Sequence, residues 1–319
     1  NPCRHTSVCS WSVMPGALPC ARCRRQWTCG ADATKQESSV KSATPTPGRA
    51  PTDAPAHIVL DRVAMAYGER EVFRDVSCSF PRGKISVVLG GSGSGKSTVL
   101  RLIAGLVHPT EGRILLDGSD VGAMRERELF AVRRNVGMMF QHGALLDSMS
   151  VFDNVAFPLV EHSRLTRQEI SDEVHRTLSA VGLANVDGLL PGELSGGMLK
   201  RVALARALIQ KPAIVLVGEA FSGLDSVSVK VIEALLVRIN RNLGMTMISV
   251  SHHIPTTMRM ADKVVLLLPD DVVQGTPQQV AHHPNARVRR FFDEEIEDPT
   301  LAGRDLPEID PGAATGARS

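Results

Sequence analysis

Hydrophobic and polar positions follow two patterns over most of this chain, one typical of strands and one typical of helices. Short apolar runs at residues 84–89, 213–217 and 245–250 predict buried strands. Helical segments lie between such runs, as at residues 98–104 and 229–243. The second of these helices is expected to share one apolar face among Ile232, Leu235, Leu236, Ile239 and Leu243. Strands that alternate with helices predict an α/β fold with a parallel sheet, whose ligand site lies at the carboxyl ends of the strands.

Two other parts of the chain carry different patterns. Residues 57–65 and 76–80 alternate apolar and polar side chains, which is typical of half-exposed strands, and they predict a small antiparallel sheet. Residues 151–192 are helical in composition, and Thr166 with Glu169 matches a capping box at the start of a helix. We therefore expect a helical subdomain in addition to the two sheets.

A glycine-rich loop at residues 90–98 follows the first buried strand and leads into a predicted helix. The spacing of its glycines, Lys96 and Ser97 matches the phosphate-binding pattern G-x-x-x-x-G-K-S. Glycines let consecutive backbone N–H groups turn inward around a polyphosphate, Lys96 adds a positive charge, and the Ser97 hydroxyl is a ligand for Mg²⁺. The loop therefore predicts a nucleoside triphosphate site formed by Gly90, Gly91, Ser92, Gly93, Ser94, Gly95, Lys96, Ser97 and Thr98.

A second glycine-rich motif, Leu194-Ser-Gly-Gly-Met198, runs directly into a helical segment at residues 199–209. Ser195 is a favourable N-cap, and Gly196 and Gly197 leave the first N–H groups of the helix uncovered. The motif predicts a second anion site, one that contains no lysine.

These two motifs together resemble the ATP-binding subunits of ABC transporters, whose signature is Leu-Ser-Gly-Gly-Gln. The resemblance covers residues 57–283. The chain departs from the family pattern at three positions: Met198 replaces the glutamine, Ser226 replaces a proline and His253 replaces an acidic residue. It implies a P-loop NTPase (RecA-like) core with a small antiparallel β-subdomain and an inserted helical subdomain at about residues 142–196. It also implies that the chain binds ATP and Mg²⁺ and hydrolyses the ATP.

The resemblance assigns roles to five further residues. Tyr67 stands where the family stacks an aromatic ring on adenine. Gln141 matches the glutamine that senses Mg²⁺ and the γ-phosphate. Glu219 matches the general base that polarises the attacking water. Asp225 lies in the loop that communicates across the dimer, and His252 matches the histidine that contacts the γ-phosphate.

A finer resemblance lies in residues 140–159, 191–198 and 284–292, which look like the ATP-binding subunits of the Mla/Mce-type phospholipid transport systems. The ATP-binding subunits of polar amino-acid importers are the alternative. In the phospholipid systems a C-terminal extension, here residues 284–319, reaches the partner ATPase subunit. The side chains expected to make this contact are Val288, Phe291 and Phe292.

One position of the family pattern is missing. The family has an apolar strand followed by Asp-Glu-Pro, whereas residues 218–220 read Gly-Glu-Ala. The aspartate normally holds Mg²⁺ through its hydration shell, but Mg²⁺ also keeps waters and other oxygen ligands. Because Ser97 and Gln141 remain as metal ligands, we expect Gly218 to weaken hydrolysis without abolishing it. A clamp that binds ATP without hydrolysing it is the alternative.

Charge and composition narrow the set of partners. The 319-residue chain has a net charge of +2, which is too balanced for nucleic acid to be a principal partner. No apolar run approaches the roughly 20 residues that span a bilayer, so a membrane role must come through a partner. ABC ATPases of DNA repair or translation carry tandem cassettes or long coiled-coil insertions, and this sequence has neither.

Residues 1–56 differ from the rest of the chain, since they hold five of the six cysteines and end in a stretch rich in Ser, Thr, Pro and Ala. We expect a disordered extension, and because the chain begins with Asn1, translation of the native protein can start at Met14 or later. Cys20 and Cys23 form half of a zinc motif, but no second pair follows. The remaining cysteine, Cys78, fits a reducing cytoplasm.

The predicted assembly follows from the single copy of each motif. One phosphate loop and one signature in the same chain cannot meet, so two copies must pair head-to-tail, each signature closing over the other copy's ATP. The resemblance places this homodimer under an integral membrane permease seated near Gln141, at the cytoplasmic face of the bacterial inner membrane. An Mce-type substrate-binding protein would belong to the same complex.

Overall fold

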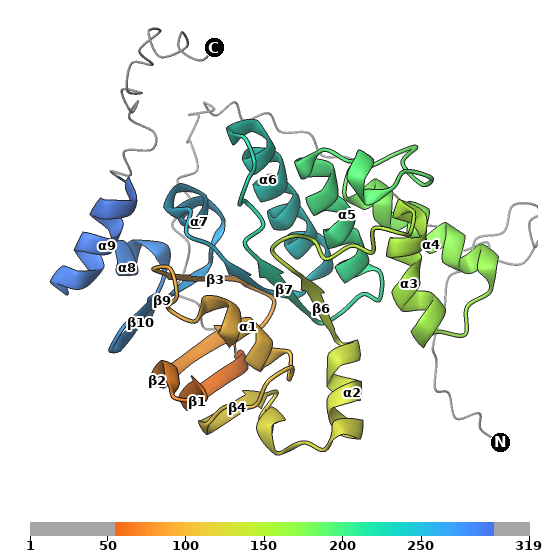
Figure 1. The fold of residues 1–319 in the computed structure, drawn as a ribbon. Helices are drawn as coiled ribbons and strands as arrows, with labels where there is room; N and C mark the ends of the chain where they lie inside the picture. The colour runs from red at the N-terminus through yellow and green to blue at the C-terminus, as the bar shows by residue number, and fades with distance from the viewer. Residues whose placement is uncertain (1–54, 297–319) are drawn as a thin grey trace, which may run out of the picture. The chain divides into compact units, whose positions relative to one another are not determined.

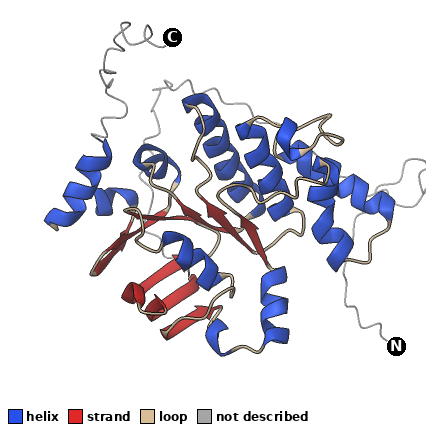
Figure 2. Ribbon diagram, in the orientation of Figure 1, coloured by secondary structure: helices blue, strands red, loops and turns tan. Residues whose placement is uncertain are grey.

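The computed structural model describes residues 55–296, with side chains up to residue 293. The cysteine-rich segment, its half zinc motif and residues 297–319 lie outside the described residues. Two sheets, with helices packed around them, make up the described part (Figures 1 and 2). The strands are β1 (Ala56–Tyr67), β2 (Arg70–Pro81), β3 (Ile85–Gly90), β4 (Glu111–Leu116), β5 (Ser119–Asp120), β6 (Val136–Met139), β7 (Ile214–Gly218), β8 (Thr246–Val250), β9 (Lys263–Leu268) and β10 (Asp271–Gly275). The α-helices are α1 (Lys96–Ile103), α2 (Glu126–Arg134), α3 (Val151–His162), α4 (Arg167–Ala180), α5 (Gly196–Leu208), α6 (Ser226–Leu243), α7 (Ile254–Met260), α8 (Pro277–Ala281) and α9 (Ala286–Ile296).

The core sheet has the strand order β10-β9-β3-β8-β7-β6. The five strands from β9 to β6 are parallel, and β10 pairs with β9 in the antiparallel direction. All residues of β3 and β8 are buried, which confirms the strands expected from the apolar runs. Because β3, β8, β7 and β6 are parallel neighbours, the loops that follow their carboxyl ends meet at one edge of the sheet.

The small sheet, of order β2-β1-β4-β5, is antiparallel, as the alternating pattern predicts. Its apolar face packs with α1 against one face of the core sheet (Figure 1). This cluster contains Ile58 and Phe80 from the small sheet, Leu102 from α1, and Leu216 and Ile248 from the core sheet. The packing fixes the hairpin that ends β1 beside the start of α1.

Helices α5 and α6 cover the opposite face of the core sheet, and α3 and α4 pack on α5 beyond the β6 edge (Figure 1). Ser195 caps α5 and Thr166 with Glu169 forms the expected capping box of α4. The helical interpretation of residues 151–192 is wrong for residues 163–166, which join α3 to α4, and for residues 181–190. The second break follows the end of α4, where Gly182 takes a left-handed φ of 72°. The subdomain limits at residues 142 and 196 stay a prediction.

Two expectations about apolar side chains are corrected. The face of α6 is buried at Ile232, Leu235, Leu236 and Ile239, but Leu243 is 60% exposed. Leu243 is the last residue of the helix and Gly244 turns the chain away in the left-handed conformation (φ 64°), so no element covers it. In α9, Val288 and Phe292 are buried in the core of their own chain, and Phe291 packs against that core. Val288 and Phe292 are therefore unavailable as contacts for a partner subunit.

Candidate nucleotide-binding site

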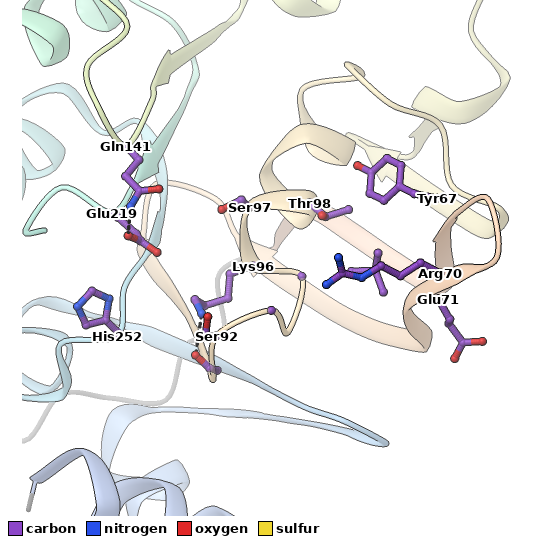
Figure 3. A pocket seen from close by; sticks show the side chains of 14 residues that line it. Tyr67, Arg70, Glu71, Ser92, Lys96, Ser97, Thr98, Gln141, Glu219 and His252 are labelled. Atoms are coloured by element: carbon purple, nitrogen blue, oxygen red, sulfur yellow. Dashed lines mark hydrogen bonds between the residues drawn. The ribbon is translucent and has the colours of Figure 1, made fainter. Parts of the chain in front are cut away.

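A cavity of ≈ 820 Å³ opens at the carboxyl ends of the central strands (Figure 3). The residues that follow four neighbouring strands point into it: Lys96 after β3, His252 after β8, Glu219 after β7 and Gln141 after β6. These positions are far apart in sequence, and the parallel sheet brings them together. The other predicted residues that line the cavity are Tyr67, Gly90, Ser92, Gly93, Gly95, Ser97 and Thr98.

The phosphate loop encloses its own lysine. The Lys96 ammonium group donates hydrogen bonds to the carbonyl oxygens of Gly90 and Gly91, both at 2.8 Å. Gly95, with φ 88°, is the N-cap of α1, and a Cβ atom there would lie 2.5 Å from the ring of Phe73. A side chain at this position would both strain the backbone and collide with β2, so the loop requires glycine. The arrangement aims a positive charge and the N-terminus of α1 into the cavity, and it suits a polyphosphate.

Gly91 and Ser94 do not line this cavity. They face a neighbouring cavity of ≈ 720 Å³ on the other side of the loop, toward Asp270 and α9. The two residues hold the shape of the loop, since the backbone N–H of Ser94 donates to the carbonyl oxygen of Gly91 at 3.2 Å.

The far end of the cavity holds a hydrogen-bonded pair of side chains, Gln141 and Glu219. The amide Nε2 of Gln141 donates to the Glu219 carboxylate at 2.6 Å (Figure 3). Glu219 has a positive φ of 36°, and its backbone N–H donates to the carbonyl oxygen of Val250 at 3.2 Å. Positive φ costs a non-glycine residue free energy and is concentrated at functional sites. This backbone turn carries the Glu219 side chain away from β7 and toward Gln141.

The oxygen atoms near this pair fit a Mg²⁺ ion that keeps water ligands. Ser97 offers a hydroxyl oxygen and Gln141 an amide oxygen, while Gly218 has no side-chain oxygen to offer. Among residues 55–296, no group of three or more His, Cys, Asp and Glu side chains is placed to hold a metal ion. A Mg²⁺ ion bound beside Ser97 and Gln141 would take its remaining ligands from phosphate oxygens and water.

At the opposite end, Tyr67 and three residues that sequence reasoning missed line the cavity. Tyr67 is 45% exposed, so its ring is open to stacking. Arg70, Glu71 and Val72 begin β2, and Arg70 pairs in register with Tyr67 across the hairpin. The Arg70 guanidinium points into the cavity toward Thr98 (Figure 3). Arg70 could have been predicted from the two-residue turn, which places it opposite Tyr67.

The signature residues Ser195, Gly196 and Gly197 do not line this cavity. The Ser195 hydroxyl accepts a hydrogen bond from the backbone N–H of Met198 at 3.3 Å, as an N-cap should. Asp225 caps the adjacent α6 by accepting from the backbone N–H groups of Val227 and Ser228, both at 2.9 Å. The hydrogen bonds from Ser228 lower the pKa of Asp225, so the cap stays ionised. The two helix N-termini, α5 and α6, lie side by side at Gly197 and Ser228.

His253, at the position where the sequence departs from the family's acidic residue, caps a helix. Its Nδ1 accepts a hydrogen bond from the backbone N–H of Thr256 at 3.3 Å and caps α7. Burial lowers the pKa of this imidazole, and the charges of Arg259 and His252 lower it further. The cap needs the neutral ring, because a protonated Nδ1 cannot accept.

Comparison with known proteins agrees with this geometry. A family model described as ABC transporter matches residues 73–222. The intermembrane phospholipid transport system ATP-binding protein MlaF of Escherichia coli (strain K12) is 41% identical over 238 residues, which cover 74% of this chain and 88% of MlaF. The probable ribonucleotide transport ATP-binding protein mkl of Mycobacterium bovis is 39% identical over 235 residues, which cover 74% of this chain and 66% of that protein.

A solved structure is also similar. A bacterial ABC transporter cassette, solved as a dimer, matches with a TM-score of 0.64 and 30% identity, covering 69% of this chain and 98% of the cassette. The same cassette was solved as a dimer in a post-hydrolysis state with ADP and Pi, also with a TM-score of 0.64. In residues 55–296, none of the helices has the length and apolar character to cross a membrane.

Proposed function

The chain belongs to the ABC transporter family of ATP-binding proteins, and from this membership we propose that it is the ATPase subunit that drives phospholipid transport at a bacterial inner membrane. The observation that carries the proposal is the cavity in which Lys96, Gln141, Glu219 and His252 converge from four neighbouring strands. No other cavity described in residues 55–296 combines a phosphate loop with a carboxylate and a histidine.

Each group at the site has a defined task in the proposed reaction. Lys96 and the amides of the phosphate loop bind the β- and γ-phosphates, and Tyr67 stacks on the adenine. Bound Mg²⁺ would neutralise phosphate charge, held by Ser97 and Gln141. Glu219 accepts a proton from the attacking water, which Gln141 orients, and His252 donates a hydrogen bond to the γ-phosphate. Because Gly218 leaves the metal without one carboxylate, we infer a reduced rate of hydrolysis.

Two copies of the chain are proposed to complete each site. The signature N-terminus at Ser195 carries uncovered N–H groups that suit a phosphate, but it lies outside the cavity of its own subunit. A head-to-tail dimer would place it over the ATP of the partner. The similar cassette that was solved as a dimer supports this arrangement.

The proposed permease contact lies on the helical subdomain. A mainly apolar cavity of ≈ 490 Å³ opens along α3 and the start of α4, where Phe157 is 40% and Val160 59% exposed. Asp153 and Arg167 stand at the same cavity. Exposed apolar surface with a few charges is typical of a protein–protein contact. This cavity suits an amphipathic segment of an integral membrane partner.

A buried asparagine connects this surface to the catalytic cavity. Asn154 on α3 is fully buried, and its amide nitrogen donates to the carbonyl oxygens of Leu146 and Met149 at 3.0 Å. Its amide oxygen accepts from the backbone N–H of Leu146 at 2.8 Å. Leu146 and Met149 belong to the segment that starts at Gln141. Movement of the permease segment would thus reach the γ-phosphate sensor through a hydrogen-bonded path.

The substrate proposal is supported by the similarity to MlaF, of which this chain covers 88%. The similarity to mkl keeps a ribonucleotide as the competing substrate class. An Mce-type substrate-binding protein would complete the system. Under this proposal the chain is a peripheral protein on the cytoplasmic face of the membrane, held there by its permease.

Co-purification tests this proposal. The chain should recover an integral membrane protein together with phospholipid, and Phe157→Asp and Asp153→Lys should each weaken that recovery. Leu243→Asp is the matched control, since Leu243 is also an exposed apolar residue but lies at the end of α6, outside the cavity. Recovery of a polar amino-acid importer, or equal loss in the control, would contradict the proposal.

A further inference from the structure

A buried lysine on the signature helix contacts both halves of the catalytic pair. Lys200 lies on α5 and is 6% exposed. Its ammonium group donates to the backbone carbonyl oxygen of Gln141, and also to the carbonyl oxygen of Glu219 at 3.2 Å. A third contact joins it to the Ser222 hydroxyl at 3.5 Å. One side chain from α5 therefore bridges the ends of β6 and β7, the two strands that deliver Gln141 and Glu219.

A second cation on the same helix holds the next part of the Gln141 loop. The Arg206 guanidinium donates to the carbonyl oxygens of Gly143 at 2.8 Å and Ala144 at 2.7 Å. Gly143 has a left-handed φ of 76°, and a Cβ there would lie 2.7 Å from Leu199 of α5. The loop thus packs directly on the signature helix and is fixed to it at the carbonyl groups of Gln141, Gly143 and Ala144.

We propose that Lys200 is a positioning residue for ATP hydrolysis, which fixes the backbones of Gln141 and Glu219 to the helix that carries the signature. The inference rests on the proposed function and adds a route of communication to it. When the signature at the N-terminus of α5 closes on the partner's ATP, a shift of α5 is transmitted through Lys200 to the catalytic pair of the same subunit. Lys200 does not touch the nucleotide cavity, so it acts only through these two backbones.

The charge of Lys200 is consistent with a positioning role. Burial lowers the pKa of its amine, and the nearby Glu219 carboxylate raises it. A buried ammonium group is costly unless it is hydrogen-bonded, and two carbonyl oxygens and a hydroxyl provide those bonds here. Hydrogen bonds from a charged donor are stronger than neutral ones, which suits a group that must hold two strand ends at a fixed separation.

The experiment compares Lys200→Met, which keeps the length of the side chain and removes the donor, with Lys200→Arg, which keeps a cationic donor. Lys230→Met is the matched control, because Lys230 is an exposed lysine on α6. Each full-length protein is measured for ATP affinity, for single-turnover hydrolysis at saturating ATP with Mg²⁺, and for hydrogen exchange of the 140–146 and 218–222 backbone without nucleotide.

Three results are expected. Lys200→Met should lower the hydrolysis rate about 10- to 100-fold, the effect of losing charge-assisted hydrogen bonds, while ATP affinity changes less than about threefold. Exchange should rise in the 140–146 and 218–222 segments, whose backbones this side chain joins, and not across the whole protein. Lys200→Arg should restore most of the rate, and Lys230→Met should match the unchanged protein.

Other results would overturn the inference. If Lys200→Met hydrolyses ATP at the unchanged rate, or loses ATP affinity and rate together, Lys200 does not position the pair. If Lys200→Met does not fold, Lys200→Arg decides the question. A Lys200→Arg protein that binds ATP normally and shows normal hydrogen exchange, but hydrolyses ATP no faster than background, would refute a positioning role. If the unchanged chain hydrolyses no ATP, the proposed function fails, and the exchange measurement still tests the anchor separately.

Discussion

Replacement of Gly218 by aspartate tests how far one missing carboxylate limits this ATPase. Gly218 is the last residue of β7 and stands next to Glu219. A Cβ added at Gly218 would lie 3.2 Å from both the backbone nitrogen of Gln141 and the carbonyl oxygen of Met139. A Cβ atom fits at these distances only if the end of β6 moves by a few tenths of an ångström. The new carboxylate would then face the same end of the cavity as Gln141 and Ser97.

The magnitude follows from what the carboxylate would do. Losing one group that stabilises transition-state charge costs about 2–4 kcal/mol by analogy with an oxyanion-hole donor. Each ~1.4 kcal/mol is a factor of ten, so Gly218→Asp should raise hydrolysis roughly 30- to 1,000-fold. Tight packing against β6 should cost about 1–3 kcal/mol of folding stability. ATP affinity should change less, because Lys96 and the loop amides do not depend on this carboxylate.

The assay is Mg²⁺-dependent phosphate release by the chain assembled with its permease. Gly218→Ala adds the Cβ without the carboxylate, and Gly218→Asn adds the same shape without the charge. Only Gly218→Asp should gain activity, and the other two should be no faster than the unchanged chain. Equal rates of phosphate release by the unchanged chain and Gly218→Asp would refute the reasoning. If Gly218→Asn gains as much activity as Gly218→Asp, the gain comes from the shape of the side chain and not from its charge.

Three further predictions concern the nucleotide, the dimer and pH. Lys96→Ala should weaken ATP binding about 10- to 100-fold in an equilibrium titration with an unchanged circular dichroism spectrum, because a charge-assisted contact is lost; unchanged affinity would contradict the phosphate-loop assignment. In a Glu219→Gln background, light scattering should show an ATP-dependent dimer that Ser195→Arg abolishes, and a dimer that persists would place the interface elsewhere. The folded-state pKa of His253 lies below the usual 6.5, so its contribution to stability is present above pH 6.5 and is lost as the pH falls below it. When thermal unfolding is measured from pH 7.5 to 5, His253→Asn should lose less stability in acid than the unchanged chain, because its cap does not titrate. An identical loss of stability in the two proteins would show that His253 does not cause it.

Local patterns predicted much of the fold because they involve neighbouring residues. The N-cap at Ser195 and the capping box at Thr166 are confirmed, since each depends on side chains within three or four positions. The buried strands were predictable because apolar runs of that length fit a parallel sheet. Leu243 shows the limit of periodicity, which identifies a face of a helix but not whether another element covers its last turn.

The remaining features depend on long-range packing, which no local pattern encodes. Arg70 reaches the cavity through the register of the β1–β2 hairpin. Lys200 reads in sequence as one of two adjacent basic residues on a helix, and only the packing of α5 against β6 and β7 buries it. Val288 and Phe292 resemble an exposed contact surface in sequence, yet α9 folds them into the core of its own chain.

The central claim is that ATP bound at this site drives phospholipid movement. The direct test is transfer of a fluorescent phospholipid in proteoliposomes that contain the chain and its co-purified permease. Transfer should require ATP and Mg²⁺, should stop in Lys96→Ala, and should quicken in Gly218→Asp in proportion to phosphate release. ATP-driven uptake of a ribonucleotide or an amino acid, with no phospholipid transfer, would contradict the account.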